Sequence, residues 1–368
     1  MASAVLDGFV VGITADRRAD EQKELLRRHG ARSVHGPTMR TLPIIADGDL
    51  RKATDALIAT PPDVVFANTG IGMRAWLSAA DSWGLGEELA DVLRGAEVVA
   101  RGPKAAGSLV TIGCDVSWRG PTGRLAEVID HLRERDLNGV RIVCQRDGST
   151  IDQAATALGA SGADVVEVAT YKWERPEDET AAGRLIDACL EGTVDAVTFT
   201  SRPALENLFA LAAERGQAAE LLDACTKSIV PVCVGPVCHE AAVAHGMPNA
   251  IVPVRPMLGA MVNALVDALG QRRVVLRLPT LELALAGTVA TVNGVRVELT
   301  SREAAVLAVL ADRPGAVVAK PTLLKAVWGD ASADPHALEM VVSRLRRQLG
   351  PGGKALRTVV RRGYMLGG

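Results

Sequence analysis

Hydrophobic positions in residues 1–270 follow two alternating patterns. Short apolar runs rich in β-branched residues alternate with longer stretches in which apolar residues recur at three- and four-residue steps. In residues 122–137, Leu125, Val128, Ile129 and Leu132 have that helical spacing. The alternation is typical of βαβ units and predicts an α/β fold with a parallel sheet. The predicted strands are residues 9–15, 64–68, 97–101, 141–145, 196–200, 230–234 and 250–254.

Two strand-turn-helix patterns each occur twice in this body. VVFANTGIGMRAWL (64–77) parallels AVTFTSRPALENLF (196–209), and VVARGPKAAGSL (98–109) parallels VCVGPVCHEAAVAHG (232–246). The repetition predicts two similar lobes. Extended segments at 32–45 and 165–174 predict a two-strand linker between them. Lobe one would then comprise residues 1–37 and 172–270, and the inserted lobe residues 46–164.

From Val274 onward the pattern changes, and residues 275–368 are expected to form a separate tail domain. Two short β-rich runs flank Asn293-Gly294, a pair that favours a hairpin turn. Thr300 and Glu303 have the spacing of a capping box and predict the start of a helix. Two further helices, over 320–328 and 334–349, and a final β-hairpin over 356–366 are predicted to follow.

Charge divides the chain at the same point. The net charge of the 368 residues is −2, but residues 271–368 contain 15 Lys and Arg against 7 Asp and Glu, whereas residues 1–270 contain 26 against 36. Clustered cations gain affinity for nucleic acids by displacing counterions from phosphates. The acidic body and basic tail therefore favour double-stranded DNA as a partner of the tail.

Composition excludes several classes of protein. No apolar run reaches the roughly 18 residues of a membrane span, and the first residues lack the pattern of a signal peptide. We therefore expect a cytoplasmic protein without a membrane partner. The six cysteines form no CxxC unit and are expected to be buried thiols. His239 and His245 complete no metal-ligand pattern with Cys233 and Cys238, so we expect no metal. The chain also has no Walker loop and no GxGxxG fingerprint, and we expect no cofactor.

Candidate ligand-binding residues lie at the ends of predicted strands or in the turns that follow them. Ligands of open α/β folds bind beyond the carboxyl ends of the strands, where turns present backbone N–H groups and helix N-termini. These positions predict an interlobe cleft that binds a small anionic ligand. The alternative for each Ser and Thr is a helix N-cap with no ligand. The predicted binding residues are Asn68, Thr69, Gly70 and Lys104 in the inserted lobe, and Thr200, Ser201 and Gly235 in lobe one.

The body resembles uroporphyrinogen-III synthases. The matching features are the FTS turn at 199–201, the VGPV turn at 234–237, the ARGPK turn at 100–104 and Tyr171 of VEVATYKW. The resemblance implies two α/β lobes and a cofactor-free enzyme that cyclises hydroxymethylbilane while inverting its last ring. Tyr171 would then be the catalytic acid that assists loss of the hydroxyl. The alternative is a linker residue whose ring packs and whose hydroxyl lies in water.

Two departures from the family pattern count against catalysis. A threonine commonly follows the Gly-Pro turns of the family, but this chain has Ala105 in one lobe and Cys238 in the other. The usual Ser-containing turn of the inserted lobe is Asn68-Thr69-Gly70 here. Fewer hydroxyls would leave a cleft that binds an anion but has fewer groups for chemistry.

The predicted helix over 334–349 separates an apolar face from a polar one. Leu338, Val341, Val342, Leu345 and Leu349 recur at helical spacing and are expected to face the core. The polar and basic residues on the other side have the character of a helix that enters the major groove of DNA. A solvated basic face without a partner is the alternative.

The tail resembles the winged helix-turn-helix domain of OmpR/PhoB-type response regulators. The matching segments are LTSREAAVLAVLADRPGAVVAKPTLLKAVWGD, LEMVVSRLRRQLG and TVVRRGYML. Val341 stands where the family often has histidine, and VRRGY replaces the usual RGxGY of the wing. The resemblance implies a recognition helix over 334–349 and a wing in the last hairpin. The implied DNA contacts are His336, Met340, Ser343, Arg344, Arg346 and Arg347 in the helix, and Arg361, Arg362 and Tyr364 in the wing.

The order of the domains favours a regulator. Response regulators place a phosphorylated receiver before this module, whereas here a synthase-like body precedes it. We predict a one-component transcriptional regulator that senses a tetrapyrrole or a related metabolite and binds promoter DNA, with a homodimer expected by analogy. Resemblance to actinobacterial proteins of this layout implies control of nitrate and nitrite assimilation. The alternatives are an active or bifunctional synthase, and a DNA-binding protein whose body only dimerises.

Overall fold

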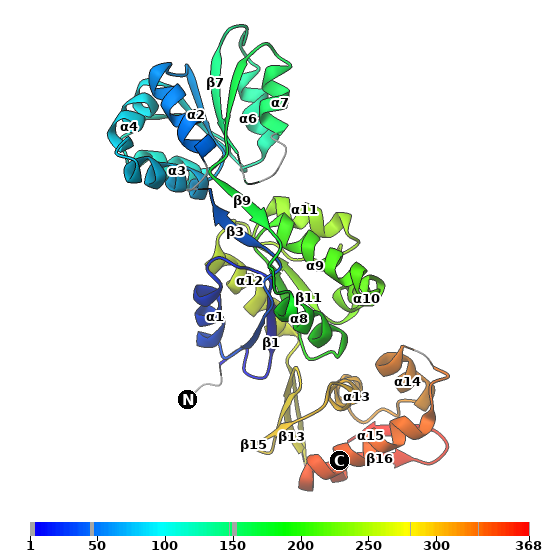
Figure 1. Ribbon diagram of the computed structural model, residues 1–368. Coiled ribbons are helices and arrows are strands. Elements are labelled where there is room, and N and C mark those ends of the chain that lie inside the picture. Colours follow the sequence, from blue (N-terminus) through cyan, green and yellow to red (C-terminus); the bar gives the residue numbers. More distant parts are fainter. Residues whose placement is uncertain are drawn as a thin grey trace. The chain divides into compact units, whose positions relative to one another are not determined.

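The computed structural model describes residues 4–44, 48–146, 148, 153–279, 281–329 and 331–367. The chain divides into two compact units, Met1–Met39 with Pro176–Gly368, and Arg40–Arg175. The first unit holds lobe one and the tail domain, and the second holds the inserted lobe and a two-stranded ribbon (Figure 1). The unit boundaries lie in or beside the two extended segments that were predicted as connections.

Lobe one is a parallel four-stranded sheet with helices on both faces (Figure 1). The strand order is β11-β10-β1-β2, with β1 at Val10–Ile13, β2 at Arg32–His35, β10 at Ala196–Phe199 and β11 at Val230–Cys233. One face packs against α1 (Ala19–Arg28) and α12 (Leu258–Gln271). The other packs against α8 (Thr180–Leu190), α9 (Arg202–Glu214), α10 (Ala218–Lys227) and α11 (Pro236–Ala244).

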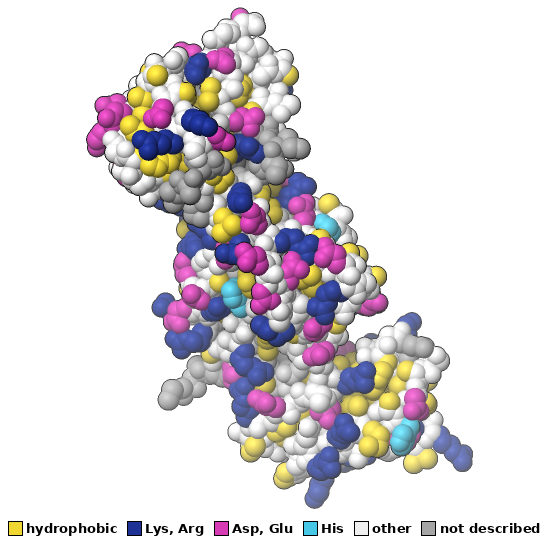
Figure 2. All heavy atoms as spheres, viewed as in Figure 1, with side chains coloured by type: hydrophobic (Ala, Val, Ile, Leu, Met, Phe, Trp, Pro, Cys, Tyr) yellow, Lys and Arg dark blue, Asp and Glu magenta, His cyan; other side chains and the backbone are white. Residues whose placement is uncertain are grey.

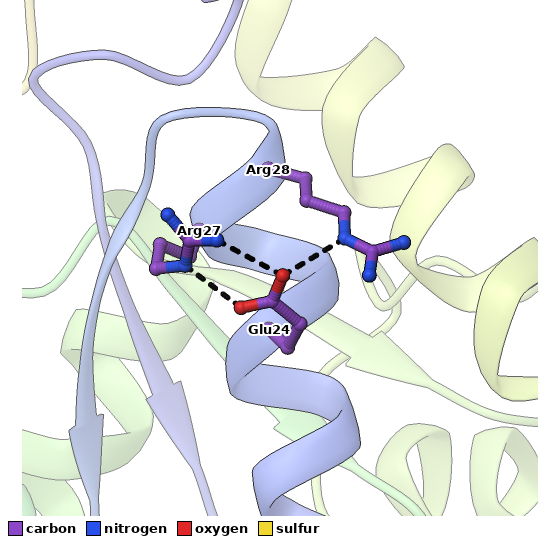
Figure 3. Close-up of polar contacts among 3 residues, drawn as sticks. All are labelled: Glu24, Arg27 and Arg28. Carbon is purple, nitrogen blue, oxygen red and sulfur yellow. Dashed lines mark hydrogen bonds and ion pairs between the residues drawn. The ribbon is translucent and has the colours of Figure 1, made fainter.

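The outer side of α1 carries a network of charged side chains. Glu24 accepts hydrogen bonds from Arg27, at 2.7 and 3.0 Å, and from Arg28, at 2.9 Å (Figure 3). These bonds, that from Arg27 first, lower the pKa of Glu24 to about 2. Two arginines in the last turn also suit the negative end of the helix dipole. The pairs are solvent-exposed and contribute little, so α1 is held in place mainly by its buried residues Ala19, Gln22 and Leu26.

The inserted lobe repeats this architecture with five parallel strands. The order is β6-β5-β4-β7-β8, with β4 at Val64–Ala67, β5 at Glu97–Ala100, β6 at Val116–Arg119, β7 at Arg141–Gln145 and β8 at Asp164–Val168. One face packs against α2 (Gly48–Ala59), α3 (Gly70–Ser82), α4 (Gly86–Gly95) and α5 (Pro103–Val110). The other packs against α6 (Leu125–Leu132) and α7 (Gln153–Gly159). In the same unit β3 (Arg40–Pro43) pairs antiparallel with β9 (Tyr171–Glu174).

The tail domain begins with an antiparallel sheet and continues with three helices. The strands are β12 (Val274–Leu278), β13 (Leu281–Ala286), β14 (Val289–Val292) and β15 (Val295–Glu298). The helices are α13 (Ser301–Ala311), α14 (Lys320–Trp328) and α15 (Pro335–Gln348), followed by the 3₁₀ helix η1 (Gly350–Ala355). A hairpin of β16 (Leu356–Val359) and β17 (Gly363–Leu366) completes the domain. One buried cluster of side chains joins sheet, helices and hairpin.

In the tail, the hairpin turn and the helix cap form where the sequence predicts them. The Asn293-Gly294 turn joins β14 to β15, with φ of +50° and +83° at its two residues. The Thr300 hydroxyl accepts from the Glu303 amide at 3.3 Å, and the Glu303 carboxylate accepts from the Thr300 amide at 2.8 Å. The capping box is therefore confirmed.

Three predictions for the body need correction. Residues 250–254 form no full strand, because Pro253 has no N–H to donate; Ile251 makes a single bridge to Val232. The helix expected over 122–137 spans only Leu125–Leu132, since the amides of Thr122 and Arg124 bind Glu127 in a capping turn. The extended segments contribute not only the ribbon but also β2 and β8, which are edge strands of the two sheets.

All six cysteine thiols are free and buried. Burial raises the pKa of Cys225 to about 12 and also raises the pKa of Cys114 and Cys189. The pKa of Cys238 is raised by its contact with Cys233 and by burial. Only a thiolate reacts quickly with a disulfide reagent, so native thiols in these surroundings are expected to be inert.

We therefore expect the folded protein to react negligibly with a chromogenic disulfide reagent at pH 8, and all six thiols to react in denaturant. Counting released chromophore against time in both conditions checks this. Rapid reaction of even one native thiol would contradict the packing described for the two lobes.

Candidate functional site

In the inserted lobe, polar side chains gather where β4 and β5 end. Asn68 follows β4, is 5% exposed, and accepts a hydrogen bond from Arg101 Nη1 at 2.7 Å. Thr69 is the N-cap of α3, with its hydroxyl 3.1 Å from the Gly72 amide that it accepts from. The Thr69 amide donates to Gln145 Oε1 at 2.8 Å. The predicted N-cap is thus real, and it belongs to a larger polar network.

Tyr171 lies inside this network. Its hydroxyl is 3.2 Å from Thr69 Oγ1, and only 3% of the residue is exposed. A Cβ on Gly148, which has φ of +91°, would stand 2.6 Å from the Tyr171 ring, so the ring packs on bare backbone. Trp173 contacts the ring edge-on at 6.1 Å. The alternative that placed the Tyr171 hydroxyl in water is wrong, because Thr69 holds it.

Glycines allow the first turns of α3 and α5 to approach each other closely. A Cβ on Gly70 would lie 2.1 Å from the Lys104 carbonyl oxygen, and one on Gly72 would lie 2.0 Å from Gln145 Nε2. Lys104 itself is exposed in the first turn of α5. Arg74 Nη1 stands 3.2 Å from the position of a Gly70 Cβ. Two helix N-termini therefore lie close together here, with the Arg74 guanidinium beside Gly70 and the exposed Lys104 in the first turn of α5.

The carboxyl end of the lobe-one sheet has the same construction. Ser201 is the N-cap of α9, with its hydroxyl 3.3 Å from the Ala204 amide and 3.3 Å from Met39 Sδ. Ser201 therefore caps a helix at the carboxyl end of the lobe-one sheet, as Thr69 does in the inserted lobe. Thr200, one residue earlier, is half-buried.

The two Gly-Pro turns are also alike. Gly102 before α5 has φ/ψ of −168°/−179°, and Gly235 before α11 has −170°/179°. Each is followed by Pro at the first helical position, and neither helix has a side-chain cap. A Cβ on Gly235 would lie 2.9 Å from Pro256 Cβ. Ala105 and Cys238 occupy the third position of these helices and are both buried, so neither turn presents a hydroxyl there.

No group of three or more His, Cys, Asp and Glu side chains able to hold a metal occurs among the described residues. His239 Nε2 lies 3.1 Å from the Ala250 carbonyl oxygen, and the His245 ring stacks on Phe209 at 5.2 Å. Both histidines thus have structural contacts. The described part of the chain also has no helix that is long and apolar enough to cross a membrane.

The third tail helix, α15, separates core and surface residues sharply. Leu338, Val342 and Leu345 are buried in the tail core, and Val341 is partly buried against it. The opposite face is exposed, and Met340 is 44% exposed on it. In Figure 2 basic side chains project from the region of the tail, together with a histidine. The exposed predicted contacts of this helix are His336, Met340, Ser343, Arg344 and Arg347.

Two predicted DNA contacts have packing roles. Arg346 donates to the Leu356 carbonyl and to Thr358 Oγ1, both at 2.7 Å, and so connects α15 to β16. Tyr364 is 4% exposed, lies in the tail core and pairs through its backbone with Val318. Arg361, with φ of +59°, and Arg362 are exposed between β16 and β17.

Sequence reasoning missed Arg74, Arg101 and Gln145 at the inserted-lobe site. Arg101 and Gln145 were taken as the last residues of two predicted strands, 97–101 and 141–145. Ligands of such folds bind at the carboxyl ends of parallel strands. Arg101 and Gln145 could therefore have been predicted on the same grounds as Asn68. Arg74 sits one turn inside α3, where spacing alone gives no such signal.

Comparisons with known proteins agree with this architecture. The profile described as uroporphyrinogen-III synthase HemD matches residues 20–263, and that described as transcriptional regulatory protein, C terminal, matches residues 294–366. The uncharacterized protein YjjA of Bacillus subtilis is 26% identical over 255 residues, covering 69% of this chain and 94% of its own length.

Relatives of the two parts separately are also found. A crystal structure of a mutant uroporphyrinogen III synthase from Thermus thermophilus is similar with a TM-score of 0.59 and 26% identity, covering 72% of this chain and 99% of the synthase. The transcriptional regulatory protein PrrA of Mycobacterium tuberculosis is 39% identical over 124 residues, which cover 31% of this chain and 53% of PrrA. The chain therefore belongs to the uroporphyrinogen-III synthase HemD family, and it carries an OmpR/PhoB-type DNA-binding domain after the HemD domain.

Proposed function

We propose that this protein is a transcriptional regulator whose HemD-like body binds a small anionic ligand and whose tail binds promoter DNA. The observation that carries the proposal is the exposed face of α15, where Arg344 and Arg347 stand beside His336, Met340 and Ser343 with no core role. Such a face matches what the major groove offers to a helix, namely phosphates, guanine edges and thymine methyl groups. Arg361 and Arg362 would add contacts from the wing, and a homodimer on paired half-sites would follow the usual geometry of such domains.

The ligand that we propose is a tetrapyrrole or a nitrogen-related metabolite. Support comes from the helix N-termini at Gly70 and Pro103, with Lys104, Arg101 and Arg74 close to them. Backbone N–H groups and fixed cations at such a site favour carboxylates. The regulated genes would be those of nitrate and nitrite assimilation, which rests on resemblance to actinobacterial proteins of this layout.

An active synthase is the second candidate, and the Tyr171 contact favours it. A tyrosine hydroxyl 3.2 Å from the Thr69 hydroxyl, at the carboxyl end of the inserted-lobe sheet, stands where an acid would be needed. Against it stand the buried Ala105 and Cys238 at the positions where family members commonly have threonine. We therefore place the regulator first.

Removal of the two exposed arginines should abolish most DNA affinity. For Arg344→Ala with Arg347→Ala we expect at least about a 30-fold loss of affinity, because each guanidinium contact contributes about 1–3 kcal/mol. The slope of log affinity against log salt should also become shallower by about 2. Fluorescence anisotropy with genomic fragments selected by the wild-type protein measures both.

The matched control is Arg277→Ala with Arg313→Ala, which removes two exposed charges from the tail outside α15. Its affinity should stay within a few fold of wild type. Equal affinity of the two double variants for the selected fragment would place the recognition surface elsewhere.

Lys104→Ala should weaken binding of uroporphyrin III, a polycarboxylated tetrapyrrole. Loss of one charge-assisted contact costs about 1.5 kcal/mol or more, so we expect at least a tenfold higher Kd by fluorescence titration. Arg135→Ala is the control, because Arg135 pairs at 2.6 Å with Glu97 at the opposite, amino end of β5. If neither variant changes the Kd for uroporphyrin III, the ligand does not bind at this site. If the protein instead shows saturable binding of nitrate or nitrite and none of uroporphyrin III, the nitrogen metabolite is favoured.

A cyclisation assay separates the two candidate functions. Given freshly generated hydroxymethylbilane, the protein should yield only the spontaneous isomer I product, because both Gly-Pro turns lack an exposed hydroxyl at Ala105 and Cys238. Chromatography of the oxidised products resolves isomer III from isomer I. Isomer III above background, lost in Tyr171→Phe while DNA binding is retained, would instead establish the synthase.

A further inference from the structure

The tail domain and lobe one meet through specific contacts within their unit. Arg296 of β15 donates to Asp7 at 2.7 Å, although 289 residues separate the two in sequence. Ala286, the last residue of β13, is 4% exposed and belongs to the same buried cluster as Leu6 and Phe9 of lobe one. One tail residue is thus part of the lobe-one core.

Two glycines with positive φ allow the backbones of lobe one and the tail domain to approach each other closely. Gly8 of lobe one has φ of +101°, and a Cβ there would lie 2.6 Å from the Ala286 carbonyl oxygen. Gly287 of the tail has φ of +53°, and a Cβ there would lie 2.8 Å from both the Gly8 carbonyl oxygen and Asp195 Oδ2. No other residue type fits either position without displacing backbone from the opposite domain.

Asp195 is a polar residue in the contact between lobe one and the tail domain. Its Oδ2 accepts from the Val10 amide at 2.8 Å, and burial raises the pKa of the carboxyl to about 6. The cations that face it are Arg32 and Arg272. Arg272 is one of only two residues between the end of α12 and the start of β12, and its guanidinium donates to the Ser228 carbonyl. The connection between the domains is therefore short and attached to lobe one.

We propose that this seam, formed by Leu6, Asp7, Gly8 and Asp195 of lobe one with Ala286, Gly287 and Arg296 of the tail, docks the DNA-binding domain rigidly on lobe one. The two domains then tumble as one body. A change in the shape of lobe one would be passed to the tail instead of being lost in a flexible linker; this last step rests on the proposed function.

The docked arrangement leaves the DNA-binding face open. The seam uses the β13–β14 turn and β15, whereas the predicted DNA contacts lie on α15 and between β16 and β17. With the seam formed, His336, Arg344, Arg347, Arg361 and Arg362 remain exposed. Docking is therefore compatible with DNA binding, and the seam serves to couple the domains rather than to inhibit the tail.

Time-resolved fluorescence anisotropy of the full chain tests the docking. A dye on Ser343→Cys reports the tumbling of α15, and labelling is selective because all six native thiols are buried. The chain carrying only this change should show slow tumbling of the whole unit. Gly287→Ala should add a fast component from a released domain, because the new Cβ meets Asp195 and the Gly8 backbone.

Gly294→Ala is the matched control. Gly294 also has positive φ, +83°, in a turn of the same sheet, but a Cβ there would meet nothing within 4 Å. A side chain there also occupies a positive-φ position, but it meets no neighbouring atom, so this variant should tumble like wild type. Arg296→Glu, which places a second carboxylate beside Asp7 without altering any backbone, should also add a fast component, smaller than that of Gly287→Ala.

Two results would overturn the proposal: a fast component in the otherwise wild-type chain, or equal tumbling of Gly287→Ala and Gly294→Ala with native circular dichroism in both. DNA affinity, measured on unlabelled protein, is a separate readout. A chain that tumbles as one body but binds no DNA would leave the seam standing and refute the proposed function.

Discussion

Helix initiation at the ends of parallel strands governs the chemistry of this body. The first backbone N–H groups of a helix have no partner within it, and here several helices begin at the carboxyl ends of two parallel sheets. Thr69 and Ser201 satisfy one amide each with a side chain, and Pro103 and Pro236 each remove a donor at the first position. The residues that look functional in the sequence are first of all those that allow these helices to start. The proposed ligand binding would depend on the cations beside these helix starts, such as Lys104 and Arg74.

That constraint explains which parts of the structure the sequence could predict. In the tail the decisive signals are local: the Asn293-Gly294 turn and the Thr300 capping box each act within a few residues, and the structure has both. In the body, turn positions such as Thr69 follow from the strand pattern. The burial of Tyr171 does not, because it depends on Gly148 and Thr69, which are distant in sequence.

Long-range pairing accounts for the other differences. Whether an extended segment becomes an edge strand or a ribbon depends on the strand with which it pairs. The sequences of β2 and β8 do not show that their partners are β1 and β7. The same holds for Arg346, whose helical position suggests an outward-facing cation. Its hydrogen bonds to Leu356 and Thr358 exist only because the last hairpin folds back beside α15. Contacts between distant segments decide these roles, and periodicity carries no information about them.

The hydrogen bonds at the two ends of the ribbon strands show how firmly each unit holds its own segments. Thr38 donates to the Ala204 carbonyl at 2.7 Å and its carbonyl accepts from Asn207 at 2.9 Å, which fixes the residues before the ribbon to α9. Tyr171, in the ribbon, is fixed to Thr69 in the inserted lobe. The chain passes from one unit to the other between Met39 and Arg40 and between Arg175 and Pro176. At the Met39–Arg40 crossing, side-chain hydrogen bonds to α9 therefore hold the chain to lobe one directly before it enters the ribbon.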